Sequence, residues 1–150
     1  MHPRANTLGI LFNENSILLE EQEGKHSQGT GIYYRPIGGT IEFGERSSDA
    51  LIREYKEELG VDINIKQYLT CVENIFQIDE KIGHEITQFY IVEFIDKSLY
   101  QKTQFQVVEL NKCTVAKWIP IEDILQKDFA LYPAGLSKIV NNYVEINHLV

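Results

Sequence analysis

The spacing of apolar positions divides the chain into segments with different periods. Short apolar runs and apolar–polar alternation dominate the first part of the chain and residues 62–119, which is typical of β-strands. Between these regions, Leu51, Tyr55 and Leu59 recur every four residues and form one apolar face of a helix. Residues 134–146 also have helical spacing. The pattern therefore predicts strands, a helix, more strands, and helices at the end.

The segment before the first helix is predicted to be mostly β-structure. Residues 4–12 and 16–21 are apolar runs separated by Asn13-Glu14-Asn15, so we expect them to pair as a hairpin. Residues 22–31 are polar and rich in glycine, and we expect a loop that is either part of a substrate mouth or a plain connection. Two further short strands are expected at residues 32–37 and 40–43.

After the helix, residues 62–79 are predicted to form one long strand with a break or bulge, followed by a turn and a strand at 85–96. Shorter strands are expected near 105–110 and at 114–119. Pro120 suits the start of a short helix, where its missing N–H has no partner to lose. Strands grouped around a few helices indicate an α+β fold, with a mixed sheet and helices packed against it.

Three acidic residues in the first helix are crowded onto one face. Glu54, Glu57 and Glu58 stand at i, i+3 and i+4, so their carboxylates repel one another and weaken the helix. A hard divalent cation with oxygen ligands, Mg²⁺ or Mn²⁺, would relieve that repulsion. Either Ser47 or Ser48 is expected as the N-cap, and Gly60 as the left-handed C-cap.

The segment from Gly39 to Val61 resembles the Nudix box, G-x5-E-x7-R-E-U-x-E-E-x-G-U, where U is a bulky apolar residue. The match reads Gly39, then Glu45, then Arg53-Glu54-Tyr55-Lys56-Glu57-Glu58-Leu59-Gly60-Val61. Tyr55 departs from the pattern mildly, because this position is usually aliphatic. The resemblance covers 23 of the 150 residues. It implies a Nudix-type α/β/α sandwich over the whole chain, 1–150, as a single domain.

The resemblance also implies roles for individual residues. Glu54, Glu57 and Glu58 would ligate the metal together with the Gly39 carbonyl, and Arg53 would orient these glutamates with Glu45 as its partner. One of the glutamates, or a carboxylate outside the box, would activate the attacking water. A planar guanidinium can hold two carboxylates at fixed angles, which suits the proposed role of Arg53.

Several candidates lie outside the helix. Glu85 is either a further metal ligand or general base, or an ordinary surface glutamate in a turn. Arg35 either contacts a substrate phosphate or pairs with a nearby acid. Gly38 and Gly39 suit a close approach of the backbone to a ligand. Aromatic residues that could stack on a base, although strand aromatics are more often core, are Tyr33, Tyr34, Trp118 and Tyr132.

Composition and charge limit the possible partners. The chain is 43% hydrophobic and 24% charged, as expected for an ordinary globular protein, and its net charge of −8 argues against nucleic acid as a partner. Cys71 and Cys113 have no metal-ligand spacing and are expected to be reduced thiols. We find no signal peptide or membrane span in the sequence and expect a cytoplasmic protein, as a monomer or a homodimer.

Two functions from different classes fit these observations. The first is a metal-dependent hydrolase, with Mg²⁺ or Mn²⁺ as cofactor, that cleaves the pyrophosphate linkage of a small nucleoside diphosphate derivative. The second is a catalytically silent Nudix-fold module that senses a nucleotide. A silent module is expected to have lost box carboxylates, whereas this sequence keeps all of them, which favours the hydrolase. RNA end-processing is disfavoured by the net charge of −8.

Overall fold

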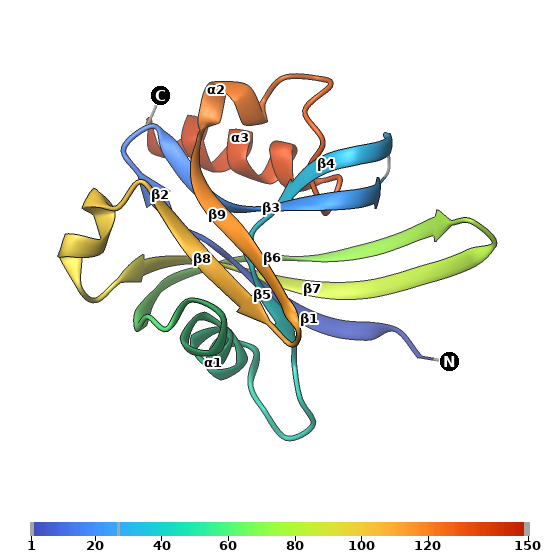
Figure 1. The fold of residues 1–150 in the computed structure, drawn as a ribbon, viewed down its shortest axis with the longest axis horizontal. Helices are drawn as coiled ribbons and strands as arrows, with labels where there is room; N and C mark the ends of the chain where they lie inside the picture. Colours follow the sequence, from blue (N-terminus) through green and yellow to red (C-terminus); the bar gives the residue numbers. More distant parts are fainter. Residues whose placement is uncertain (1, 27, 149–150) are drawn as a thin grey trace.

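The computed structural model describes residues 2–26 and 28–148. Two β-sheets stand between helix α1 (Ser47–Leu59) on one side and helices α2 (Ile121–Ile124) and α3 (Leu136–Asn147) on the other (Figure 1). The first sheet has the order β5-β1-β7-β6, with bounds Ile37–Thr40, Arg4–Ile10, Lys81–Phe94 and Ile63–Ile78. The second has the order β2-β3-β9-β8, with bounds Phe12–Asn13, Ser16–His26, Lys112–Pro120 and Gln104–Glu109.

The remaining elements complete this arrangement. Strand β4 (Gly29–Arg35) pairs with β3 at the edge of the second sheet, and a 3₁₀ helix, η1 (Lys97–Gln101), leads into β8. Strands β1 and β7 are parallel, whereas β1 and β5 are antiparallel, so the first sheet is mixed. The α+β sandwich predicted from the sequence is therefore confirmed, with two sheets in place of one.

The predicted hairpin between residues 4–12 and 16–21 is wrong for most of its length. Phe12 and Asn13 pair with Ile17 and Ser16 of β3, and the Leu11 carbonyl accepts a hydrogen bond of 3.1 Å from the Leu18 N–H. Strand β1 instead lies between β5 and β7 in the other sheet, and its residues from Asn6 to Ile10 are all buried. A strand that is buried on both faces belongs in the middle of a covered sheet, which a two-stranded hairpin cannot provide.

Two expectations for residues 22–43 are also wrong. Residues 22–26 and 29–31 belong to strands rather than to the predicted loop, because β3 and β4 continue as a paired ribbon to His26 and Gly29. Pairing between the two strands satisfies the backbone N–H and C=O groups of this polar segment. The segment lacks the apolar alternation from which a strand could be predicted. The short strand lies at Ile37–Thr40 rather than at 40–43. Pro36 separates β4 from β5, at the point where the chain crosses from one sheet to the other.

Helix α1 has the expected extent, although its start differs from the prediction. It ends at Leu59, and Gly60 adopts the left-handed conformation with φ of 69°. Neither Ser47 nor Ser48 is the N-cap, because the helix begins after Arg46, without a side-chain cap. The Ser47 hydroxyl forms a hydrogen bond of 2.5 Å with the Tyr90 hydroxyl instead, which fastens the helix start to β7.

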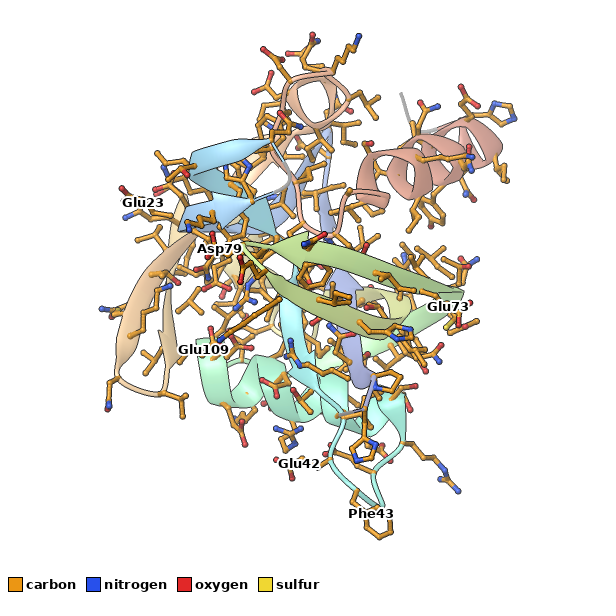
Figure 2. All side chains as sticks on the ribbon, turned by 90° about the vertical axis from the view of Figure 1, so that its right-hand side faces the viewer. Glu23, Glu42, Phe43, Glu73, Asp79 and Glu109 are labelled. Atoms are coloured by element: carbon orange, nitrogen blue, oxygen red, sulfur yellow. The ribbon has the colours of Figure 1, made fainter. Side chains whose placement is uncertain are left out.

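Later elements agree with the sequence pattern. Strand β6 is 16 residues long and contains register shifts between Ile65 and Gln67 and between Tyr68 and Thr70, as the predicted break requires. Two apolar cores lie on opposite sides of the sheets. One surrounds Leu51 and Tyr55 of α1, and the other packs α3 against the sheets. The first core packs α1 against the sheets, and Glu109 of β8 lies close to this helix (Figure 2).

Candidate active site

Arg53 holds several carboxylates around the start of the acidic face of α1. Its guanidinium donates two hydrogen bonds to Glu45, of 2.8 and 3.0 Å, and one each to Glu54 and Glu57, of 3.1 Å. It also donates to the backbone carbonyl of Thr40 at 3.1 Å, which ties α1 to β5. The hydrogen bonds from Arg53 hold the pKa of Glu45 at about 2. Glu45 therefore stays ionised and holds the Arg53 guanidinium in place.

The carboxylate of Glu54 lies directly over Gly39. A Cβ atom at position 39 would stand 2.6 Å from Oε1 of Glu54, closer than any real contact. Glycine is therefore required here by a close approach of two site residues. The structure thus brings together Gly39, Glu54, Arg53 and Glu45, and leaves Glu57 at the exposed edge of the group, with 59% of its side chain accessible.

Glu58 turns inward from the same helix into a second set of carboxylates. It is 4% exposed, and both of its carboxylate oxygens lack a hydrogen-bond partner among the described residues. Oxygen atoms of Glu58, Glu20 on β3 and Glu109 on β8 all lie within 4.8 Å of one another. Burial, together with the neighbouring carboxylates of Glu54, Glu109 and Glu20, raises the pKa of Glu58 to about 9.

Arg35 is the counter-charge of this inner group. It donates hydrogen bonds to Glu20 at 3.2 Å and to Glu109 at 2.9 Å. Glu20 also accepts hydrogen bonds from Gln22 at 2.6 Å and Thr114 at 2.5 Å, so its carboxylate is fully partnered. Of the two sequence-based alternatives for Arg35, pairing with a nearby acid is the one that the structure contains.

Arg35 pairs with Glu20 and Glu109, whereas neither oxygen of Glu58 has a hydrogen-bond partner in the part of the chain that the structure describes. The donors around them are carboxylates, the ligand type that Mg²⁺ and Mn²⁺ prefer. The residues present therefore fit a hard divalent cation. Neither Glu20 nor Glu109 could be recognised as a site residue from the sequence. Each follows a short apolar run, where an acidic residue indicates only the end of that run.

The structure does not bring Glu85 to this group. Arg4 and Glu85 pair across β1 and β7, whereas Gly39 pairs with Thr7 on β1. Alternate residues of a strand point to opposite faces, so Arg4 and Glu85 lie on the face turned away from Gly39 and α1. Glu85 is 5% exposed and accepts a hydrogen bond of 2.7 Å from Arg4. It is too buried to be the ordinary turn glutamate of the second sequence-based reading.

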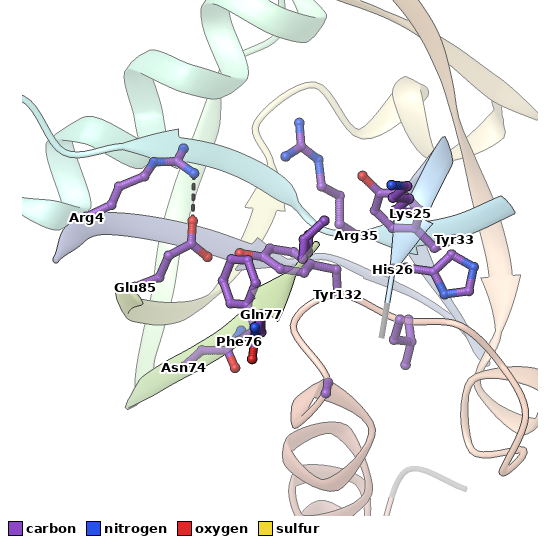
Figure 3. Close-up of a pocket in the computed structure, with 13 residues that line it drawn as sticks. Arg4, Lys25, His26, Tyr33, Arg35, Asn74, Phe76, Gln77, Glu85 and Tyr132 are labelled. Atoms are coloured by element: carbon purple, nitrogen blue, oxygen red, sulfur yellow. Dashed lines mark hydrogen bonds and ion pairs between the residues drawn. The ribbon is translucent and has the colours of Figure 1, made fainter. Parts of the chain in front are cut away.

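A cavity of about 470 Å³ lies on that side (Figure 3). Its lining includes Arg4, Glu85, Arg35, Tyr33, Phe76 and Tyr132. Arg35 lines the cavity and also bonds Glu20 and Glu109, so it connects the cavity to the carboxylates beside α1. Of the other aromatic candidates, Tyr34 packs on Phe129 and Trp118 on Tyr100, both as parts of the cores.

The NUDIX domain family matches residues 2–138 of the chain. The chain belongs to the Nudix family. The resemblance seen in the box is therefore confirmed over nearly the whole sequence, and the Nudix helix is α1.

Individual relatives agree with this assignment. An ADP-ribose pyrophosphatase of Methanocaldococcus jannaschii is 31% identical over 99 residues, which cover 66% of this chain and 56% of that protein. Nudix hydrolase 2 of Arabidopsis thaliana is 28% identical over 120 residues, covering 80% of this chain and 39% of that protein. Both relatives are longer, and the matched segment of this chain spans about half or less of each.

A crystal structure of a MutT Nudix hydrolase from Burkholderia pseudomallei has the same fold. It superposes with a TM-score of 0.67 at 19% sequence identity and covers 93% of this chain and 98% of that one. At this identity the likeness concerns the fold alone. Within residues 2–26 and 28–148, no helix is long and apolar enough to cross a membrane.

Proposed function

We propose that this Nudix protein is a metal-dependent pyrophosphohydrolase acting on a nucleoside diphosphate joined to another group. The observation that carries the proposal is Glu58, a buried carboxylate that is set among Glu54, Glu20 and Glu109 and whose two oxygens have no hydrogen-bond partner within residues 2–26 and 28–148. A protein that only needed a stable helix would not keep such a group, since an unpaired buried polar atom is costly.

The proposed metal is Mg²⁺ or Mn²⁺, held by Glu54, Glu57 and Glu58 with the Gly39 carbonyl, and with Glu109 as a further candidate. When bound, such an ion neutralises the phosphate charges, polarises the phosphorus centre and makes bound water more acidic. Arg53 fixes the orientation of Glu54 and Glu57 before the ion arrives, because its fork bonds both of them and the Thr40 carbonyl. Preorganised ligands lose little entropy on binding.

The exposed position of Glu57 suits contact with solvent and substrate. Its side chain is 59% accessible and its carboxylate is held by Arg53, so it can accept a proton from a water at the edge of the group. Arg35 stands between Glu20 and Glu109 and opens onto the cavity, where it could exchange one carboxylate for a substrate phosphate. Glu45 supports the site through Arg53.

A substrate panel tests this proposal. Nucleoside triphosphates, nucleotide sugars, ADP-ribose, dinucleoside polyphosphates and capped RNA would each be incubated with Mg²⁺ and with Mn²⁺, and product release measured. ADP-ribose is included because one relative is named for it. We expect turnover of at least one substrate, lost on chelation. Glu57→Gln and Glu58→Gln should each lower kcat by about 100-fold or more, because both act at the reacting centre.

Glu73→Gln is the matched control, since Glu73 is an exposed glutamate on β6 outside the carboxylate group. It should turn over substrate at the wild-type rate. Near wild-type turnover in Glu58→Gln would reject the metal assignment. Nucleotide binding without any turnover across the panel would reject the hydrolase and favour a sensing module.

A further inference from the structure

Glu58 is closed off from any ion in the arrangement that the structure shows. Neither of its carboxylate oxygens reaches the surface, and oxygen atoms of Glu20 and Glu109 lie within 4.8 Å of it. An ion such as Mg²⁺ arrives from solvent and binds its ligands at about 2.0–2.1 Å. A neighbouring side chain therefore has to move before Glu58 can serve as a ligand.

Of the two neighbouring carboxylates, that of Glu20 is fixed. This residue is 1% exposed, and it accepts hydrogen bonds from Gln22, Thr114 and Arg35. Glu20 and Arg35 stand directly opposite each other on the paired strands β3 and β4, so their side chains share one face of the ribbon. Displacing Glu20 would leave a buried charge and its three donors without partners, which is costly.

The carboxylate of Glu109 is held far less firmly. Glu109 is the last residue of β8, before the turn at Leu110 and Asn111, and its side chain is 42% accessible. The one hydrogen bond that this carboxylate accepts from the described part of the chain comes from Arg35, at 2.9 Å. Arg35 is therefore shared between a carboxylate that is fixed and one that can leave, and its bond to Glu109 is the contact that opens most readily.

Both members of this pair can be reached from solvent. A groove of about 550 Å³ between the β3–β4 ribbon and the tip of the β8–β9 hairpin is lined by Arg35 and Glu109, together with Lys112. Arg35 also lines the cavity beside β1 and β7. A phosphate group that enters from either side meets a guanidinium whose planar fork suits phosphate as well as carboxylate. It would replace Glu109 at Arg35 and leave Glu20 in place.

We propose that Arg35 withholds Glu109 from the metal position and releases it when a phosphate of the substrate takes its place. Glu109 is then free to turn toward that position, and its departure clears a way to Glu58. The inference rests on the proposed function for the metal and the diphosphate, although its test needs no turnover. Arg35 acts through Glu109 and is therefore a positioning residue. Metal and phosphate favour each other's binding beyond their direct contact, because each takes one partner of the same ion pair.

Titration of the full chain with Mn²⁺, followed by calorimetry in the absence of any phosphate, tests whether Arg35 withholds Glu109. Arg35→Lys keeps the charge but replaces the fork by a single ammonium group, which stays with the buried Glu20 and gives up Glu109. We expect this variant to bind Mn²⁺ about 5-fold more tightly than the wild type, the upper end for a pair with one exposed partner. Glu109→Gln should weaken Mn²⁺ binding about 5-fold more in the Arg35→Lys background than in the wild type.

A merely structural role for Arg35 predicts the reverse, because loss of the fork would loosen the carboxylates and weaken Mn²⁺ binding. Unchanged or weaker binding by Arg35→Lys, in a variant with a wild-type melting curve, would therefore overturn the proposal. Arg46→Lys is the matched control, since Arg46 is exposed just before α1, and it should bind Mn²⁺ like the wild type. A wild-type protein that binds no Mn²⁺ would overturn the proposed function as well.

Pyrophosphate binding to the metal-free chain, titrated in EDTA, tests the exchange at Arg35 without altering that residue. In Glu109→Gln, the phosphate no longer has to displace a carboxylate, so we expect affinity for pyrophosphate to rise by about 5-fold. Glu57→Gln removes an equal charge from a carboxylate that Arg53 holds, and should change the affinity by less than about 2-fold. Equal affinities in the two variants, or no binding to Glu109→Gln at millimolar pyrophosphate, would overturn the exchange. Hydrolysis itself is still judged by the substrate panel.

Discussion

Replacing Glu58 by glutamine should make the metal-free protein more stable, although it lowers the activity. The substitution keeps the size of the side chain and removes a carboxyl group that the fold accommodates poorly. Glu58 is 4% exposed, lies within 4.8 Å of the carboxylate oxygens of Glu20 and Glu109, and has no hydrogen-bond partner for either oxygen among the described residues. The glutamine NH₂ group can donate to one of these two neighbours without first taking up a proton, as the carboxyl group must.

The size of the effect follows from linkage. The pKa of Glu58 rises from 4.5 to about 9, mainly through burial. At pH 7 the folded state must therefore take up a proton that the unfolded state has lost, at a cost of about 3 kcal/mol. Glutamine avoids this cost but buries an amide, so we expect a net gain of about 1–3 kcal/mol. For a chain of this size, that gain raises Tm by roughly 3–10 °C.

The stability difference between Glu58→Gln and the wild type should depend on pH. A carboxyl group with a raised pKa in the folded state destabilises the protein increasingly as the pH rises from 4.5 towards 9. Thermal melts in EDTA should therefore show Glu58→Gln and wild type alike near pH 4 and increasingly different up to pH 8. Addition of Mg²⁺ should raise the Tm of the wild type and close part of the gap, with little effect on the variant.

The variant Glu57→Gln separates the effect of burial from the effect of removing a carboxylate from α1. Its side chain is 59% accessible and forms only an i,i+4 pair with Arg53, so its metal-free Tm should stay within about 2 °C of wild type. If Glu58→Gln melts at or below the wild-type temperature in EDTA at pH 8, the view of Glu58 as a strained, unsatisfied carboxyl is refuted. A gap that is just as large at pH 4 would show that its cause is packing rather than charge.

The two glycines that face α1 should respond differently to alanine. In Gly39→Ala the new methyl group, 2.6 Å from Oε1 of Glu54, displaces that carboxylate from its place beside Arg53, so activity should fall by about 10-fold or more while Tm changes by less than about 3 °C. In Gly9→Ala the methyl group meets the buried Tyr55 ring at 2.9 Å, so unfolding free energy should fall by about 1–3 kcal/mol. Tyr55→Leu should restore part of that loss in the double variant, as shown by denaturant melts, and additive losses would contradict the contact.

Local patterns account for the parts of the fold that could be predicted. The extent of α1 followed from the spacing of Leu51, Tyr55 and Leu59 and from Gly60, all within one short segment. The bulged strand β6 and its partner β7 followed for the same reason, since a tight turn joins them. The position of β1 did not, because its partner β7 is about 80 residues away and the pairing depends on burial of both faces.

The candidate site likewise combines residues that are close in the sequence with residues that only the fold brings together. Arg53, Glu45 and the helix glutamates stand in one stretch at fixed spacing, and the structure places Arg53 against all of them except Glu58. Glu20 and Glu109 join the group only when β3 and β8 come together around β9. Tyr55, the mild departure from the box pattern, is explained by Gly9, whose missing side chain leaves room for the larger ring. Gly9 and Tyr55 also lie far apart in the sequence, so their contact could not be predicted from either segment alone.

The crossing at Pro36 lets one short stretch of chain serve both groups of carboxylates. Arg35, just before the crossing, bonds Glu109, whereas Gly39, just after it, makes room for Glu54. An insertion or deletion between residues 35 and 39 would therefore displace both groups at once. Changes of length should be tolerated far better at the tip of the β3–β4 ribbon, which bears on neither group.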